Sequence, residues 1–210
     1  MAVAVLTLNA MEMNPALLQN NRIAPDFGYG RYRLGMMVAL ASVVMLFTGL
    51  SSAYIVRAAS APDWVVLPLP RLLWAGTAVL LCSSVTLEFS RRSLKRQLNE
   101  SYRRWLAATS LLGVAFLFLQ FSVWRQLVAQ GVYITSHPHS SFFYLLTATH
   151  GLHLAGGLLA LFYLLFRHRI PLLDYEDKAK RVAVTDAATL YWHFMDALWV
   201  YLFFLLFLWR

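Results

Sequence analysis

The chain has 210 residues, of which 60% are hydrophobic and only 13% are charged, with a formal net charge of +8. A soluble domain usually carries about 25% charged residues, so this composition indicates an integral membrane protein. The basic residues lie in short segments between apolar runs rather than in one patch, which argues against nucleic acid as a partner. The single cysteine, Cys82, excludes an internal disulfide, and its apolar surroundings predict a buried thiol.

Residues 1–33 are mixed in composition and contain Pro15 and Pro25. They lack the pattern of a cleavable signal peptide, and we interpret them as an N-terminal cytoplasmic arm. Residues 34–210 predict an all-α membrane domain of five transmembrane helices, since each apolar run reaches the roughly 20 residues that span a bilayer and only helices satisfy their own backbone there. The predicted spans are about 34–57, 70–91, 105–126, 142–167 and 184–209.

The basic residues also predict the orientation of these spans. Fourteen of the 18 Lys and Arg residues lie in the N-terminal arm and in the second and fourth loops, which share one side of the membrane. Segments rich in Lys and Arg stay in the cytoplasm. We therefore expect a cytoplasmic N-terminus and a C-terminus on the outer side.

Ionisable residues occur inside the last two predicted spans. His150 and His153 are three residues apart, and Asp186, His193 and Asp196 are spaced by seven and three, so each set shares one helix face. With a rise of 1.5 Å per residue, His153 lies roughly 15 Å from the outer end of its span, and Asp196 lies roughly 15 Å from the inner end of its own span. The two could therefore meet near the midplane if the helices are antiparallel neighbours. Insertion of such a group costs about 2.5–3.5 kcal/mol, so each needs a partner or a function.

Three interpretations fit this intramembrane polar cluster: a metal or haem site, a proton relay, or a hydrogen-bonded clamp between helices. Metal sites gather three or four ligands in definite geometry. Two histidines three residues apart, one distant histidine and one aspartate do not match the ligand set of such a site. No Cys-x-x-Cys-His motif for haem attachment is present. The clamp is favoured, and we expect no catalytic residue, metal ligand or cofactor in this chain.

Other polar residues fall near the predicted span ends. Glu88 precedes Arg91 and Arg92 by three and four residues, the spacing of an ion pair on one helix face. Arg91, Arg92, Arg167 and Arg169 are candidate ligands for anionic lipid headgroups. His137 and His139 flank Pro138 in a predicted outer loop, and we interpret both as surface residues.

Two runs resemble subunit III of the haem–copper terminal oxidases, the family of cytochrome c oxidase. One is His150-Gly151-Leu152-His153 followed by Gly157, and the other is Tyr191-Trp192-His193-Phe194-Met195-Asp196-Ala197-Leu198-Trp199. Weaker similarity lies at 34–36, 81–86 and 131–135, and the resemblance covers about residues 31–210. Five spans fit the short bacterial form of the family, which lacks two N-terminal helices.

The resemblance implies an accessory, non-redox subunit of a proton-pumping oxidase, of the cytochrome c or the quinol type, in the bacterial inner membrane. It would contact subunit I directly, assemble with subunit II and other small subunits, and bind structural phospholipid in a cleft between helices. Haem and copper would belong to the partner subunits. One departure is Val43, which stands where the family usually has an intramembrane glutamate. Asp186 occupies another family carboxylate position with a side chain one methylene shorter, and both differences favour a structural role.

Two other functions remain open from the sequence. A subunit III-like protein associated with nitric oxide reductase shares the five-span pattern. A small transporter could use the histidine and aspartate cluster, although the chain shows neither internal repeats nor broken helices, which transporters tend to have.

Overall fold

The computed structural model describes residues 26–60, 70–167 and 175–208. Within these ranges the chain is helical and contains no strand, which confirms the predicted all-α fold. Five helices are each long and apolar enough to cross a membrane. They are α3 (Asp26–Ser60), α4 (Leu72–Lys95), α5 (Asn99–Ala129), α6 (Pro138–Arg167) and α7 (Tyr175–Leu208).

The helices extend beyond the predicted spans. α3 begins at Asp26, within the segment interpreted as an arm, and α7 begins at Tyr175 rather than near residue 184. The 31 residues of α5 correspond to about 46 Å of helix, against a hydrocarbon core of about 30 Å. The apolar run sets the minimum length of a membrane helix, and its polar flanks here continue the same backbone hydrogen bonding.

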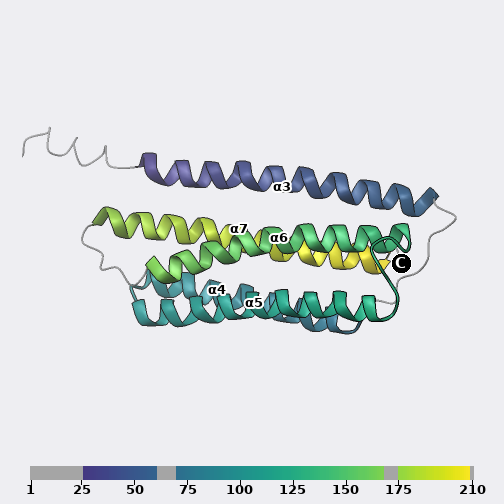
Figure 1. The fold of residues 1–210 in the computed structure, drawn as a ribbon. Coiled ribbons are helices and arrows are strands. Elements are labelled where there is room, and N and C mark those ends of the chain that lie inside the picture. Colours follow the sequence, from purple (N-terminus) through teal and green to yellow (C-terminus); the bar gives the residue numbers. More distant parts are fainter. Residues whose placement is uncertain (1–25, 61–69, 168–174, 209–210) are drawn as a thin grey trace, which may run out of the picture.

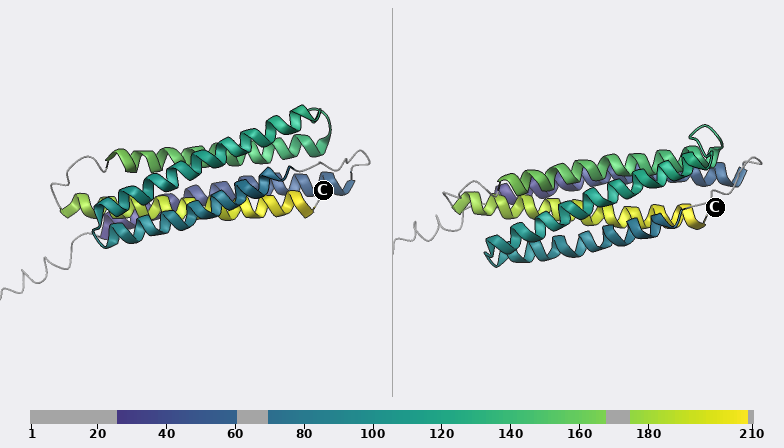
Figure 2. Two further views of the ribbon diagram at one scale, coloured as in Figure 1. Left: turned by 90° about the horizontal axis from the view of Figure 1, so that it is seen from below. Right: turned by 60° about the horizontal axis from the view of Figure 1, so that its bottom comes forward.

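α7 is the central helix of the bundle. It contacts α3, α4 and α6, while α4 pairs with α5 and α6 also contacts α5 and α3. Figure 1 shows the resulting arrangement, with α3 on one side, α6 and α7 in the middle, and α4 and α5 on the other side. The further views show that all five helices run along a common direction (Figure 2). The predicted contact between the last two helices is confirmed.

Large aromatic side chains fill the interior where small residues let the helices approach. Trp192 and Trp199 of α7 are fully buried. A Cβ atom added at Gly113 of α5 would lie 2.8 Å from Cη2 of Trp192, and one added at Gly157 of α6 would lie 2.9 Å from Cε1 of Tyr191. Both distances are too short for carbon atoms in contact, so glycine at these positions leaves room for the Trp192 side chain against α5 and for the Tyr191 side chain against α6.

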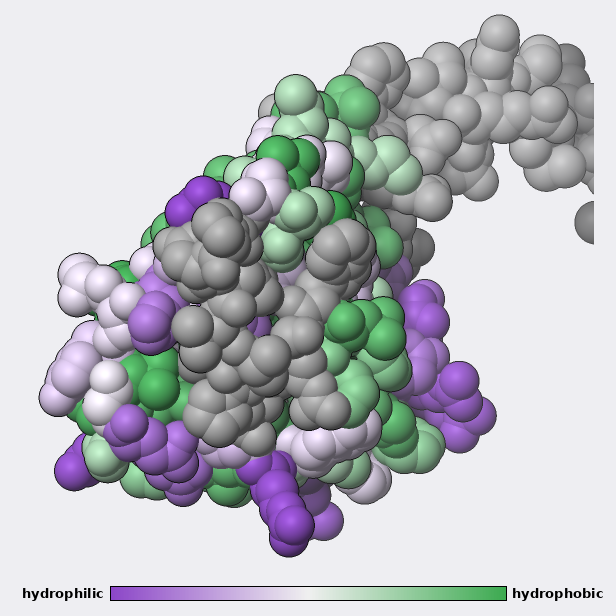
Figure 3. Space-filling model, turned by 90° about the vertical axis from the view of Figure 1, so that its right-hand side faces the viewer, coloured by the Kyte–Doolittle hydropathy of each residue, from purple (hydrophilic) through white to green (hydrophobic). Residues whose placement is uncertain are grey.

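The two ends of the bundle differ in charge. One end, called here the basic end, carries Arg91, Arg92, Lys95, Arg96, Arg103, Arg104, Arg167, Lys180 and Arg181. The opposite end is viewed in Figure 3, where hydrophilic and hydrophobic residues are interspersed, as is expected where helices leave a bilayer. At that end α5 stops at Ala129, and Gly131 follows with a φ of +79°, which glycine adopts readily.

Candidate functional site

The two histidines of α6 lie in aromatic surroundings. His150 is fully buried, and neither ring nitrogen has a hydrogen-bond partner among the described residues. Its ring packs against Phe47 of α3, Phe116 of α5 and Trp199 of α7, with centroid distances of 6.4, 6.2 and 5.1 Å. His150 is therefore part of the packed interior where four helices meet.

His153 is half-buried beside α3 and forms a local bond. Its Nδ1 lies 2.8 Å from the carbonyl oxygen of Thr149, one turn back on α6. Its own carbonyl oxygen accepts a hydrogen bond from the hydroxyl of Tyr191 at 2.9 Å. The contact between α6 and α7 at this level thus uses the backbone of His153 and the side chain of Tyr191.

Asp196 is bonded to α4 and not to a histidine of α6. It is 3% exposed, and its Oδ2 accepts a short hydrogen bond from the hydroxyl of Ser84. The same hydroxyl oxygen lies 2.7 Å from Nδ1 of His193. The predicted meeting of Asp196 with His153 is wrong, because that face of α7 is turned toward α4. The sequence feature that could have indicated the true partner is the hydroxyl of Ser84, which stands in the middle of an apolar run.

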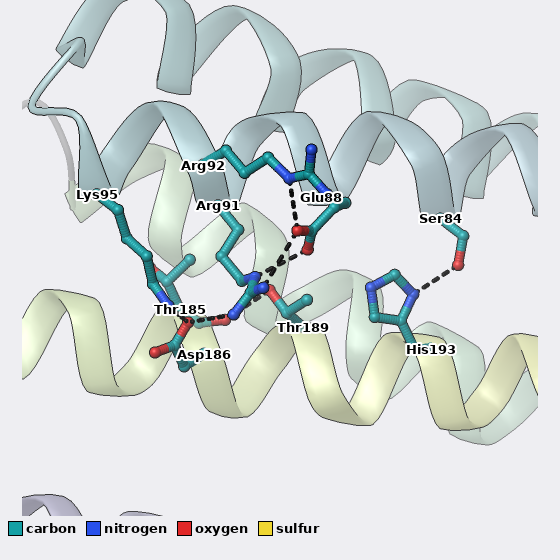
Figure 4. A network of polar contacts seen from close by, with 9 residues as sticks. All are labelled: Ser84, Glu88, Arg91, Arg92, Lys95, Thr185, Asp186, Thr189 and His193. Atoms are coloured by element: carbon teal, nitrogen blue, oxygen red, sulfur yellow. Dashed lines mark hydrogen bonds and ion pairs between the residues drawn. The ribbon is translucent and has the colours of Figure 1, made fainter.

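Further toward the basic end, α4 and α7 are joined by ion pairs (Figure 4). Glu88 contacts Nε of Arg91 and Nε of Arg92, both at 2.8 Å, which confirms the pairing expected from their spacing. Arg91 also approaches Oδ1 of Asp186 at 3.5 Å, and Nζ of Lys95 lies 3.5 Å from the same oxygen. Glu88 and Asp186 are therefore both neutralised within the chain.

We call this set of residues the α4/α7 polar seam: Ser84, Glu88, Arg91, Asp186, His193 and Asp196. Two tryptophans reinforce it from the buried side. Nε1 of Trp192 donates to Oγ of Ser83 at 2.9 Å, and Nε1 of Trp199 donates to Oγ1 of Thr77 at 3.0 Å. Each bond satisfies a buried donor and ties α7 to α4. The seam thus spans about two turns of α4 and about three turns of α7.

Within the described ranges, residues of α7 contribute to several grooves. The first, of about 450 Å³, lies between α3 and α7, and its lining is mainly apolar, including Phe47, Phe194 and Tyr201. The second, of about 360 Å³, contains Glu88, Arg91, Asp186 and His193, with Met36 contributed by α3. The third, of about 310 Å³, runs along α4 and includes Ser84, Glu88, Arg92 and His193. His193 and Glu88 therefore line the same two grooves.

The remaining predicted positions are distributed over the bundle. Arg167 lies at the basic end, where its Nη1 donates to the hydroxyl of Tyr163 at 2.6 Å, and Arg169 lies outside the described residues. Two predictions are wrong. His139 is buried, with Nε2 3.3 Å from the hydroxyl of Tyr54, because α6 starts at Pro138 and turns this side chain inward. Cys82 is exposed on α4, because the face of α4 that carries it points away from the bundle.

Within the part of the chain that the structure describes, no three His, Cys, Asp or Glu side chains gather as a metal site would require. The ionisable groups of the seam are instead arranged as ion pairs and hydrogen bonds, partly within α4 and partly between α4 and α7. Such an arrangement orients helices and neutralises buried charge, and it also joins two titratable side chains through one hydroxyl.

Comparison with known proteins identifies the family. The model of the family "Cytochrome c oxidase subunit III" matches residues 28–210. The chain belongs to the cytochrome c oxidase subunit III family. The match spans all five helices except the first residues of α3. Subunits of this family are members of a multi-subunit oxidase complex, and five membrane-spanning helices make this member a multi-pass membrane protein.

Relatives from several bacteria carry the same designation. The chain is 34% identical over 174 residues to the probable cytochrome c oxidase subunit 3 of Mycobacterium tuberculosis, covering 81% of this chain and 84% of the relative. It is 31% identical over 199 residues to the cytochrome c oxidase subunit 3 of Synechocystis, covering 90% and 83%. For the protein of a Bacillus species, the identity is 31% over 176 residues, covering 81% and 82%. The similarity is thus spread over most of each chain.

Proposed function

We propose that this chain is the accessory, non-redox subunit III of a bacterial proton-pumping cytochrome c oxidase. Its role is to stabilise the catalytic subunit I, which it contacts directly, in a complex that also contains subunit II and other small subunits. The observation that carries this proposal is that the polar side chains inside the membrane are used for helix–helix contacts, as in the bond between Asp196 and Ser84. Haem and copper are assigned to the partner subunits.

The distribution of basic residues supports an orientation for the subunit. Most Lys and Arg side chains of the described helices lie at the basic end, whereas Arg57, Arg71 and Arg125 lie toward the other end. The positive-inside rule assigns the basic end to the cytoplasm. The N-terminus is then cytoplasmic, and α7 ends on the periplasmic side of the inner membrane.

The grooves along α7 support binding of a structural phospholipid. Asp186 lines the polar groove near the basic end, and Tyr201 lines the apolar groove between α3 and α7. Fifteen residues of helix separate them, about 22 Å at 1.5 Å per residue, which exceeds the depth of one leaflet of a core about 30 Å thick. Arg91 and Asp186 offer charges of both signs at the headgroup end, and the apolar groove fits an acyl chain.

The function is tested by affinity purification of this chain from its native membrane in mild detergent. A reduced-minus-oxidised spectrum of haem a, with oxidase subunits I and II among the co-purifying chains, is the expected result. Partners of nitric oxide reductase with b- and c-type haem would replace the proposal by that alternative. A colourless protein without partners would point to a transporter.

Lipid binding is tested separately with two alanine-to-tryptophan variants of the purified complex. Ala197 lines the apolar groove, whereas Ala148 is exposed on α6 away from it. Mass spectrometry of retained phospholipid should show loss of bound lipid in Ala197→Trp and none in Ala148→Trp. Equal lipid content in both variants would contradict binding in this groove.

A further inference from the structure

Ser84 stands between two titratable side chains in the middle of the bundle. It lies 11 residues from the end of α4 at Lys95, about 16 Å along the helix. Its hydroxyl oxygen is 2.7 Å from Nδ1 of His193 and is bonded to Oδ2 of Asp196. A serine hydroxyl accepts and donates hydrogen bonds at the same time, so the three side chains form one continuous hydrogen-bonded chain.

The two ends of this chain differ in their surroundings. Asp196 is buried, and its Oδ1 has no hydrogen-bond partner among the described residues. His193 is half-buried and lines the two polar grooves together with Glu88. The Glu88 and Asp186 ion pairs continue the polar path from His193 to the basic end (Figure 4). One end of the chain is therefore reachable from the basic end, and the other is enclosed.

We propose that His193, Ser84 and Asp196 form a proton-exchange unit, a function beyond the accessory role proposed above. In the transfer step, Nδ1–H of His193 gives its proton to Oγ of Ser84 while the hydroxyl proton of Ser84 passes to Oδ2 of Asp196. The imidazolium becomes neutral imidazole, the carboxylate becomes a carboxylic acid, and Ser84 is unchanged. His193 is then reloaded with a proton from the groove that it shares with Glu88.

The charges around the unit are set by α4 and α7. The titratable groups that line the same grooves in the described ranges are Glu88, Arg91 and Arg92 on α4 and Asp186 on α7, while α3 contributes only Met36. Glu88 contacts both arginines, and Asp186 contacts Arg91 and Lys95. Among the described residues, these ion pairs lie on the side of His193, and none of them involves Asp196. His193, which takes up the proton, is therefore near paired charges, whereas Asp196, which receives it, is not.

The test is infrared spectroscopy of the complete oxidase complex in lipid nanodiscs. A carbonyl band of a protonated carboxyl group should appear as the pH is lowered and should be lost in Asp196→Asn. After transfer to D2O the band of the native complex should shift, and this shift should be slower in Ser84→Ala. The matched control is Ser83→Ala, which removes the neighbouring hydroxyl bonded to Trp192 but leaves the unit intact.

Two results would overturn the proposal. One is the absence, at every pH at which the complex is intact, of a carboxyl band that Asp196→Asn removes. The other is an exchange rate in Ser84→Ala equal to that of Ser83→Ala, which would give Ser84 a structural role only. If Ser84→Ala lowers the yield of the complex, His193→Gln tests the same step, because it removes the proton donor and should also slow the shift.

Discussion

Replacing Gly113 with alanine tests the close packing of the Trp192 side chain of α7 against α5. The new methyl carbon would lie 2.8 and 3.1 Å from Cη2 and Cζ2 of Trp192 and 3.1 Å from Cδ1 of Leu158. The indole cannot move away easily, since it is fully buried and its Nε1 donates to Ser83 at 2.9 Å. The substitution therefore forces either α5 or the indole out of position.

The cost follows from comparison with Gly156→Ala. A Cβ at Gly156 would meet nothing within 4 Å, so this variant gains only helix propensity, up to about 1 kcal/mol. Gly113→Ala gains the same propensity but also pays for overpacking, which typically costs about 1–3 kcal/mol. The two variants should therefore differ by about 1–3 kcal/mol, with Gly113→Ala the less stable.

The assay is the melting temperature of this subunit in the purified complex, which is monitored as the loss of the subunit from the complex on heating. For a chain of this size, each kcal/mol corresponds to about 2–4 °C. The melting temperature of Gly156→Ala should equal or slightly exceed that of the unmodified subunit. The melting temperature of Gly113→Ala should be clearly lower than that of Gly156→Ala. Equal melting temperatures for the two variants would refute the close contact between the Trp192 side chain and α5 at Gly113.

Three further changes should be measured by the same assay. Asp196→Leu removes the acceptor of the Ser84 hydroxyl and should cost about 1–3 kcal/mol, whereas Asp196→Asn keeps an acceptor and should cost less; equal losses would argue against the clamp. Trp199→Phe removes the bond to Thr77 and should cost about 1 kcal/mol. Glu88→Gln should cost at most about 1 kcal/mol, less in high salt; a larger, salt-independent loss would contradict a partly exposed ion pair.

Helix number and the local ion pairs were predictable from the sequence. Five apolar runs of sufficient length have no alternative to helices in a bilayer, and the confirmed contacts of Glu88 with Arg91 and Arg92 follow from spacing on one helix. Both inferences need only information along the chain. They therefore hold without knowing which helices are neighbours.

The contacts between distant helices could not be predicted in the same way. Asp196 meets Ser84 rather than His153 because the rotation of α7 about its axis is set by the seating of Trp192 and Trp199 against α4. Short loops show which helices are adjacent but not how each helix is rotated. The burial of His139 was missed for a related reason, since α6 starts one residue before it, and the predicted span began later.

The contacts of α3 have a consequence for the order of events during synthesis. α3 is the first of the five helices along the chain, yet it touches only α6 and α7 among the described helices. It therefore reaches the membrane before either of its neighbours has been made, and its own hydropathy must hold it there as a solitary helix. The α4–α5 hairpin, by contrast, is complete as soon as α5 emerges. The contacts of α3 can therefore be completed only after α7, the last helix along the chain, has been made.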